Sequence, residues 1–333
     1  MVMDSCEEIY PGIFKIVQSK PRRIAPPVNI YIIAGDDGLI FDAGYGDDTS
    51  IHLAGDAINS IQNRNKNWRI LRVLPSHSHP DHFSGLKQLK SHYGLKVMLT
   101  EQMASVLSNK HAYRNSYKLS TLQKYRYSTV FERISELPLQ VVFRTMYKKV
   151  YGIAFLQSHD TTVRPGETIA INGYNFTIIH GPGHCNDHIM LYDNKEGILF
   201  AGDNILRSIY TWLGPPRSNL QEYFDTLEAC LRLPNLKLIL SAHGSTIHNP
   251  KDRIKEIIEY RKLRTRQVYS LVANETHGIT FARLLNSIYP RSLERRWLAK
   301  GWIIVTLEYL VDNHILTFEG RKIKLGANDI NTV

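Results

Sequence analysis

Short apolar segments separated by polar turns dominate the first hundred residues and predict buried strands. Turn residues such as Pro26-Pro27 and Asp36-Asp37-Gly38 separate them. The runs occupy residues 13–17, 28–33, 39–41, 70–74 and 96–100. Helical spacing of apolar residues at 48–62 and 83–93 alternates with these runs. This alternation of short strands and helices predicts an α/β fold with a helix-covered sheet.

The second half of the pattern begins with a predicted β-hairpin. Residues 168–171 and 174–179 flank Asn172-Gly173, a dipeptide that favours a type I′ turn. Further apolar runs follow, and each is again short enough for a buried strand. They occupy residues 189–192, 197–201 and 236–240. These strands predict a second sheet downstream of the first.

A dense group of potential metal ligands follows the run at 70–74. The segment reads His77-Ser78-His79-Pro80-Asp81-His82. In extended backbone, side chains two residues apart project to the same side, so His77 and His79 can bind one cation together. Asp81 and His82 come after the chain turns, and they can offer oxygen and nitrogen to a second cation. Imidazole with carboxylate suits zinc, iron or manganese rather than calcium or magnesium.

This segment resembles the His-x-His-x-Asp-His signature of the metallo-β-lactamase superfamily. Other segments typical of that family follow in its order: Gly181-Pro182-Gly183-His184, Gly202-Asp203 and Ser241-Ala242-His243-Gly244. Upstream, Leu39-Ile40-Phe41-Asp42-Ala43-Gly44 matches the family's strand and aspartate beneath the metals. The resemblance covers roughly residues 10–250.

The resemblance implies an αββα sandwich with two metal ions at one edge. One ion would be held by His77, His79 and His184, and the other by Asp81, His82 and His243. Asp203 would bridge the two ions. Asp42 and His188 are expected to support the ligands rather than to bind metal.

The same resemblance implies hydrolysis by a hydroxide that bridges two divalent ions, with zinc expected and iron or manganese as alternatives. Asp81 would accept the proton of the attacking water. The segment from Gly181 to His188 is similar to hydroxyacylglutathione hydrolases, lactonases and related thioesterases, which favours an ester or thioester substrate such as an acyl-CoA. An endoribonuclease that cleaves single-stranded RNA is the alternative. A nucleic-acid-binding regulator with a metal-site sensor is a third interpretation, from another class.

Residues of about 102–160 exceed what the minimal pattern needs and are interpreted as a helical insertion. Between residues 110 and 149 there are nine Lys and Arg against two Glu. One interpretation is a helical cap whose charges are simply solvated. The other is a lid over the metal edge that binds an anionic substrate.

The chain from residue 251 to 333 is expected to form a separate domain after the catalytic part at 1–250. Three helical patterns at 250–272, 280–289 and 292–311 precede a hairpin that turns at Glu319-Gly320, an order that resembles a winged helix. Fifteen Lys and Arg outnumber nine Asp and Glu from residue 251 onward. Such a domain either binds nucleic acid or packs against protein. The surplus of apolar residues between 297 and 309 favours packing against protein, with a homodimer as the expected assembly.

The composition of the chain adds expectations about its location. The 333 residues are 43% hydrophobic, enough for a sizeable core, yet no run of about eighteen apolar residues suggests a membrane span. Acidic residues near the N-terminus do not match a signal peptide, so a cytoplasmic location is expected. The three cysteines Cys6, Cys185 and Cys230 suggest no disulfide framework, and Cys185 is expected to be a buried loop residue.

Overall fold

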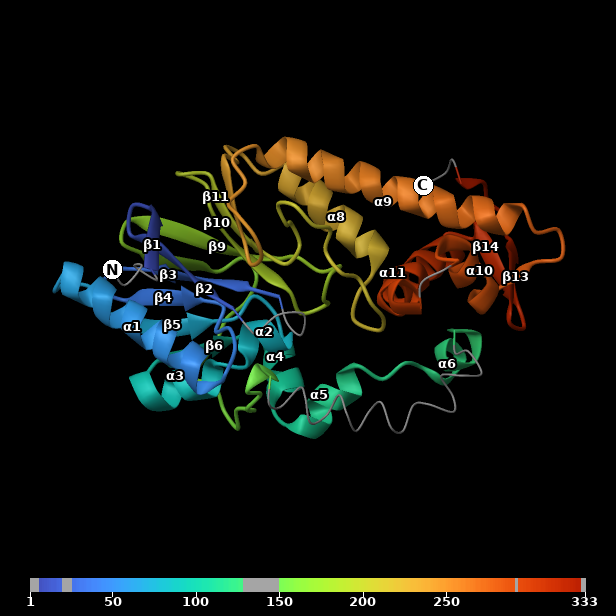
Figure 1. Cartoon of the computed structure of the whole chain (residues 1–333). Helices are drawn as coiled ribbons and strands as arrows, with labels where there is room; N and C mark the ends of the chain where they lie inside the picture. The colour runs from blue at the N-terminus through green and yellow to red at the C-terminus, as the bar shows by residue number, and fades with distance from the viewer. Residues whose placement is uncertain (1–5, 20–25, 128–149, 291–292, 331–333) are drawn as a thin grey trace.

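Two facing β-sheets form the centre of the molecule in the computed structural model of the chain (Figure 1). The structure describes residues 6–19, 26–127, 150–290 and 293–330. The first sheet has seven strands and the second has five. A third sheet of three strands belongs to the C-terminal segment, residues 250–330. The expected mixed α/β fold is confirmed.

The first sheet runs in sequence order from β1 to β7. Its strands are β1 (Cys6–Tyr10), β2 (Ile13–Gln18), β3 (Val28–Ile33), β4 (Gly38–Phe41), β5 (Ile70–Leu74), β6 (Lys96–Leu99) and β7 (Thr161–Thr162). Strands β1 to β4 pair antiparallel, whereas β4, β5, β6 and β7 pair parallel. Because parallel strands end at the same edge of a sheet, the residues after β4 and β5 meet there.

The second sheet has the order β12-β11-β10-β9-β8. Its strands are β8 (Thr168–Ile171), β9 (Tyr174–His180), β10 (Ile189–Asp193), β11 (Ile198–Gly202) and β12 (Leu238–Ser241). Strands β8 and β9 form the predicted hairpin, and Asn172 and Gly173 at its turn both have positive φ. Strands β9, β11 and β12 run in one direction, since β10 is antiparallel to β9 and β11 while β11 and β12 are parallel.

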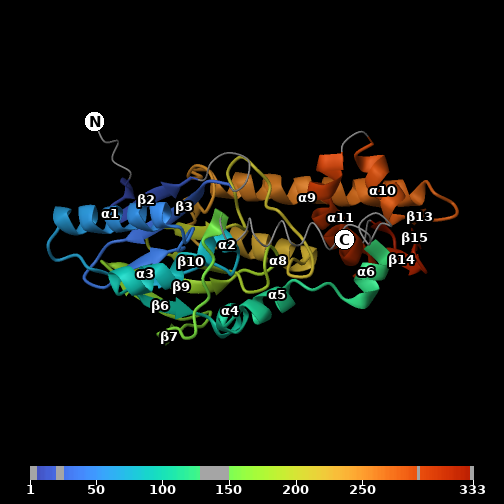
Figure 2. The same cartoon turned by 60° about the horizontal axis from the view of Figure 1, so that its bottom comes forward.

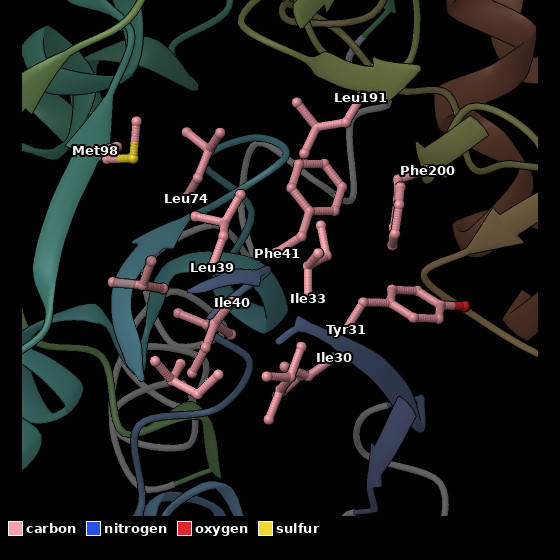
Figure 3. Packing of buried hydrophobic residues seen from close by; sticks show 14 of the residues in the cluster. Ile30, Tyr31, Ile33, Leu39, Ile40, Phe41, Leu74, Met98, Leu191 and Phe200 are labelled. Carbon is pink, nitrogen blue, oxygen red and sulfur yellow. The ribbon is translucent and has the colours of Figure 1, made fainter. Parts of the chain in front are cut away.

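The two sheets pack face to face through a continuous apolar core. Phe41 of the first sheet and Leu191 and Phe200 of the second belong to it, and Figure 3 shows these side chains gathered between the strands. Helices α1 (Asp48–Arg64) and α3 (Leu86–Tyr93) cover the other face of the first sheet (Figure 1). Helices α8 (Leu220–Leu231) and α9 (Pro250–Ala273) lie beyond the second sheet.

The described part of the expected insertion contains three helices, α4 (Glu101–Leu107), α5 (Lys110–Ser116) and α6 (Thr121–Tyr127). Figure 2 shows them in a row that leads from the first sheet to the C-terminal segment. There, the Tyr127 hydroxyl bonds to Glu308, and the Arg126 guanidinium lies 4.2 Å from the ring centroid of Phe318. The described part of the insertion therefore connects the first sheet with the C-terminal segment. Its expected residues at 128–149 lie outside the described part.

The C-terminal segment continues from α9 through β13 (Ile279–Thr280), α10 (Phe281–Ile288) and α11 (Leu293–Asp312) to a hairpin of β14 (Leu316–Glu319) and β15 (Lys322–Leu325). The three strands form a sheet in the order β13-β15-β14. Three helices and a closing hairpin agree with the sequence pattern, and β13 is an addition to it. The assignment to the winged-helix class stays a prediction.

Three details differ from the predicted elements. Strand β1 is an edge strand whose Glu7 and Glu8 are exposed, so it lacks a strong apolar pattern. Helix α8 was not expected, although Asn219 caps it and apolar side chains recur along one face. The helix expected at 83–93 is interrupted: α2 (Pro80–Phe83) ends before Gly85, and α3 begins after it. A Cβ at Gly85 would lie 2.3 Å from the Ala43 carbonyl oxygen, so the backbone between α2 and α3 packs directly on the residues that follow β4.

Candidate metal centre

The strand ends of both sheets converge at one edge, and each delivers one group of expected ligands. Strand β5 leads into His77, and β11 leads into Asp203. Strand β12 leads into His243, and β9 leads into the turn that carries His184. Because β9, β11 and β12 run in one direction, their carboxyl ends face the same edge. The fold itself thus brings together residues more than 160 positions apart.

The first cluster consists of His77, His79, His184 and Asp203, all buried. One nitrogen or oxygen atom from each residue lies within 4.8 Å of the others. His184 Nε2 is 3.2 Å from His77 Nε2 and 2.9 Å from His79 Nδ1. Three imidazole nitrogens therefore face one point from three directions.

The second cluster consists of Asp81, His82 and His243, again with one potential ligand atom each within 4.8 Å of the others. Asp203 lies between the clusters. Its Oδ1 is 3.3 Å from His243 Nε2 and 3.6 Å from His82 Nε2, whereas its Oδ2 is 3.5 Å from His184 Nε2. The two carboxylate oxygens of Asp203 thus face different clusters.

Hydrogen bonds behind the histidines fix which ring nitrogen faces the centre. His184 Nδ1 donates to the Trp212 carbonyl at 2.7 Å, and His243 Nδ1 donates to the Pro27 carbonyl at 2.6 Å. A carbonyl can only accept, so Nδ1 carries a proton and Nε2 is the ring nitrogen that faces the centre. The Asp42 carboxylate reaches His82 Nδ1 at 3.0 Å and fixes that ring in the same way.

The electrostatics divide the histidines into two sets. Burial lowers the pKa of His77, His79 and His184, so these rings are neutral and able to bind a cation. Burial also opposes charge on His82 and His243, but nearby carboxylates outweigh it. Asp42 and Asp203 raise the pKa of His82 well above its ordinary range, and Asp203 raises that of His243 to about 9.

This donor set fits divalent transition-metal ions. His82 Nε2 and Asp203 Oδ1 are buried and have no hydrogen-bond partner in the described part of the chain. Buried polar atoms without partners cost free energy, so atoms aimed at a common point indicate a ligand between them. Without a metal, protons on His82 and His243 balance the carboxylates, and cations would replace those protons.

Asp42 and His188 lie behind the two clusters. Asp42 has a positive φ of 71°, and its Oδ1 accepts from the Ser76 amide at 2.7 Å while its Oδ2 faces His82. His188 Nε2 accepts from the Asp203 amide at 3.2 Å, and burial lowers the pKa of its ring to about 3. Both residues lie outside the two ligand clusters, and each contacts a member of them.

Arg217 is a buried residue of the site that the sequence did not indicate. Its guanidinium pairs with Asp187 at 2.7 Å and donates to Ser78 Oγ at 2.6 Å, while Cys185 Sγ donates to the same aspartate at 3.0 Å. Arg217 also lies 5.4 Å from the ring centroid of Tyr117, which itself packs against His79 at 6.2 Å. The arginine therefore connects the loops that carry His79 and His184. Cys185 is buried, as expected.

Trp212 is the second unexpected residue, and it lies beside His79. The residue is 51% exposed, although its ring centroid is 6.3 Å from that of His79. A Cβ at Gly214 would lie 2.1 Å from the nearest atom of this indole, so the glycine allows the ring to approach the backbone closely. The only available sequence signal was the proximity of Trp212 to Asp203 in a segment without periodicity.

Comparison with known proteins identifies the class. A sequence model described as the metallo-beta-lactamase superfamily matches residues 23–243, which is well over half of the chain. The chain belongs to the metallo-beta-lactamase superfamily, as the motifs predicted.

Individual relatives are distant or match only in part. The lactamase-like protein aptB of Emericella nidulans is 32% identical over 32% of this chain and 33% of its own length. An atrochrysone carboxyl ACP thioesterase of Pseudocercospora fijiensis is 23% identical over 95% of this chain and 79% of its own. A beta-lactamase domain protein from Burkholderia ambifaria shares the fold at a TM-score of 0.76, with 18% identity over 98% of this chain and 95% of that one. The matched regions of the first three curated relatives cover 33% to 46% of their lengths.

No helix in the described ranges is long and apolar enough to cross a membrane.

Proposed function

We propose that the chain hydrolyses an ester or thioester at a centre of two divalent metal ions, zinc in the first instance. One ion would be bound by His77, His79 and His184, and the other by Asp81, His82 and His243. The position of Asp203 carries the proposal. One of its oxygens faces His184 and the other faces His243, as a bridging carboxylate requires.

Two bound divalent ions would lower the pKa of a water molecule and stabilise negative charge on the attacked carbonyl oxygen. Asp81 is the residue that we assign to the proton of that water. Its side chain is 14% exposed and faces two histidines of one cluster, whereas Asp203 lies between both clusters and Asp42 is buried. A carboxylate with this access can accept a proton as well as bind a cation.

The charge of the centre and the exposed Trp212 side chain favour an anionic acyl substrate. Two aspartates and five neutral imidazoles would leave a charge of about +2 on a centre with two divalent ions. The exposed Trp212 ring offers an apolar surface directly beside His79. The thioesterase relative aligns along most of this chain, which is consistent with a thioester. An acyl-CoA combines the required thioester with negative phosphates.

Cleavage of single-stranded RNA is the second candidate, favoured by the basic surplus of residues 110–149 and 251–333. Some of these basic residues contact other residues of the same chain. Lys324 pairs with Glu319, and the Arg321 guanidinium lies 5.8 Å from the Tyr125 ring centroid. Arg296 donates to the Tyr289 carbonyl at 2.7 Å. These contacts weaken the argument for a phosphate-binding face.

A substrate panel tests the proposal. Zinc-loaded protein is incubated with acyl-CoA esters of increasing chain length, with p-nitrophenyl acetate and with labelled single-stranded RNA. We expect thioester turnover that His184→Ala removes and Asp56→Asn, an exposed change on α1, leaves unchanged. RNA cleavage without ester turnover would refute the proposal. In that case the affinity for RNA should fall with salt concentration, at a logarithmic slope of about −0.7 per neutralised phosphate.

A further inference from the structure

Helix α9 carries two buried arginines, Arg253 and Arg261, which are 7% and 6% exposed. Arg253 has a carboxylate partner in the exposed Glu256, at 2.8 Å. Arg261 has no carboxylate partner in the described part of the chain. Its guanidinium lies 5.7 Å from the ring centroid of Tyr223 and 5.9 Å from that of Tyr260. Since burying a charge without a counter-charge costs free energy, its polar contacts need an explanation.

Both arginines bind backbone carbonyls of one loop. This loop, residues 205–218, connects Asp203 to helix α8 and is called the site loop below. Arg253 Nε donates to the Leu206 carbonyl at 2.8 Å, and its Nη2 donates to the Ile209 carbonyl at 2.9 Å. Arg261 Nη2 donates to the Thr211 carbonyl. A planar guanidinium with several donors can hold such carbonyls in a fixed arrangement.

The site loop in turn contacts two of the expected metal ligands. The Thr211 hydroxyl donates to the Asp203 carbonyl, and the Trp212 carbonyl accepts from His184 Nδ1 at 2.7 Å. The Ser218 hydroxyl donates to the His184 carbonyl at 2.6 Å. Moving the loop would therefore move the partners of His184 and Asp203 together.

Helix α11 also contacts the same loop. A Cβ at Gly301 would lie 2.7 Å from the Leu213 carbonyl oxygen and 3.2 Å from Gly214 Cα. Glycine at this position thus allows the helix backbone to approach the loop directly. The C-terminal segment contacts the site loop through a second helix.

We infer that Arg253 and Arg261 are positioning residues of the hydrolytic site. They hold the site loop in the conformation that presents the Trp212 carbonyl to His184, the Thr211 hydroxyl to Asp203 and the Trp212 ring to the substrate. The C-terminal segment is accordingly a part of the active site and not a detachable binding module. Only the catalytic readout of this inference rests on the proposed function.

Three variants of α9 test the inference in the full-length, zinc-loaded protein. Arg261→Met removes the donors, Arg261→Lys keeps one charged donor, and Arg266→Met is the control, because Arg266 is exposed on the same helix. We expect Arg261→Met to lower kcat about 10- to 100-fold, with KM for a small ester changed less than about 3-fold, because misplaced groups reduce the rate steeply. Arg261→Lys should recover most of this loss, and Arg266→Met should show none.

A second readout needs no turnover. Arg207 is exposed within the site loop, so trypsin can cut after it once the loop is released. Mass spectrometry of fragments that end at Arg207 should show cleavage at least about 10-fold faster in Arg261→Met than in the wild type or in Arg266→Met. If no ester is hydrolysed by the wild type, the proposed function fails while this measurement still decides the inference.

Several results would overturn the inference: unchanged cleavage after Arg207, an equal loss in Arg266→Met, or Arg261→Lys as impaired as Arg261→Met. Should Arg261→Met fail to fold, Thr211→Val tests the same connection from the loop. It removes the hydroxyl that binds the Asp203 carbonyl and leaves α9 intact. We expect a loss of kcat of about 10-fold with an unchanged melting temperature. Normal kcat in this variant would contradict the assigned role of the site loop in holding Asp203.

Discussion

At the scale of single residues, the site combines neutral imidazoles with imidazoles that carboxylates hold in the charged form. His77, His79 and His184 form the neutral set, and His82 and His243 form the charged set. The six-residue segment from His77 to His82 could be recognised from sequence because its ligands are close together in the chain. The Trp212 carbonyl and the Arg217 guanidinium could not, since a backbone acceptor has no residue signature and Arg217 lies in an irregular loop.

The stability of metal-free protein should fall as the pH rises from 6.5 to about 9. Folding raises the pKa of His243 from 6.5 to about 9. The contribution of this residue to the free energy of unfolding is therefore complete below pH 6.5 and is lost as the pH rises through 9. The loss should be on the order of 3 kcal/mol for this residue, at about 1.4 kcal/mol per pKa unit. Urea unfolding of chelator-treated protein at both pH values measures it.

The zinc-loaded protein is the control for this pH series. Bound cations replace the protons, so its stability should not fall over the same range. A metal-free protein equally stable at pH 6.5 and 9 would show that His243 is not held charged by Asp203.

Asp81→Asn should fold normally and lose most turnover. The amide keeps the shape of the side chain but removes the charge and the proton acceptor, and general-base contributions are about 10²- to 10⁴-fold in rate. Steady-state kinetics beside a melting curve separate the two effects. Asp56→Asn is the matched control, and activity of Asp81→Asn close to that of the control would remove Asp81 from the proposed role.

At the scale of elements, the strand ends determine the site. Apolar runs predicted the strands well because most are buried on both faces and read as continuous hydrophobic segments. Edge strand β1 escaped prediction because exposed Glu7 and Glu8 interrupt its pattern. The break between α2 and α3 escaped as well, because it depends on the contact of Gly85 with Ala43 rather than on local preference.

Phe200→Ala should destabilise the fold by about 3–5 kcal/mol, since it opens a cavity between the two sheets. The Phe200 ring is fully buried, and its centroid lies 5.3 Å from that of Tyr31 and 5.7 Å from that of Phe41. Denaturant unfolding measures the change. Leu71→Ala, on β5 but 42% exposed, should cost far less, and equal losses in both variants would contradict the assigned core.

At the scale of the whole molecule, the C-terminal segment shares its core with the second sheet. One buried cluster contains Leu199 and Ile239 of that sheet together with Ile257 of α9 and Ile303 and Leu307 of α11. Of the apolar residues of α11 that suggested a homodimer, Ile303, Ile304, Leu307 and Tyr309 are buried within one chain and Trp302 is half-buried. Sequence alone could not show this, because the amount of apolar surface does not reveal what covers it.

The shared core predicts a single unfolding transition for the metal-free chain. Calorimetry should give one peak with equal calorimetric and van't Hoff enthalpies, because the core of the C-terminal segment is continuous with the outer face of the second sheet. Two separate transitions would show that residues 251–333 form an independent domain, as the sequence had suggested.

The central claim is a centre of two metal ions, and elemental analysis of the purified chain tests it most directly. Protein purified without chelator should contain close to two transition-metal ions per chain. His184→Ala and His243→Ala, which affect different clusters, should each reduce the content toward one, while His52→Ala on the exposed face of α1 should leave it at two. A wild-type content of one ion or none, after dialysis against zinc, would contradict the account.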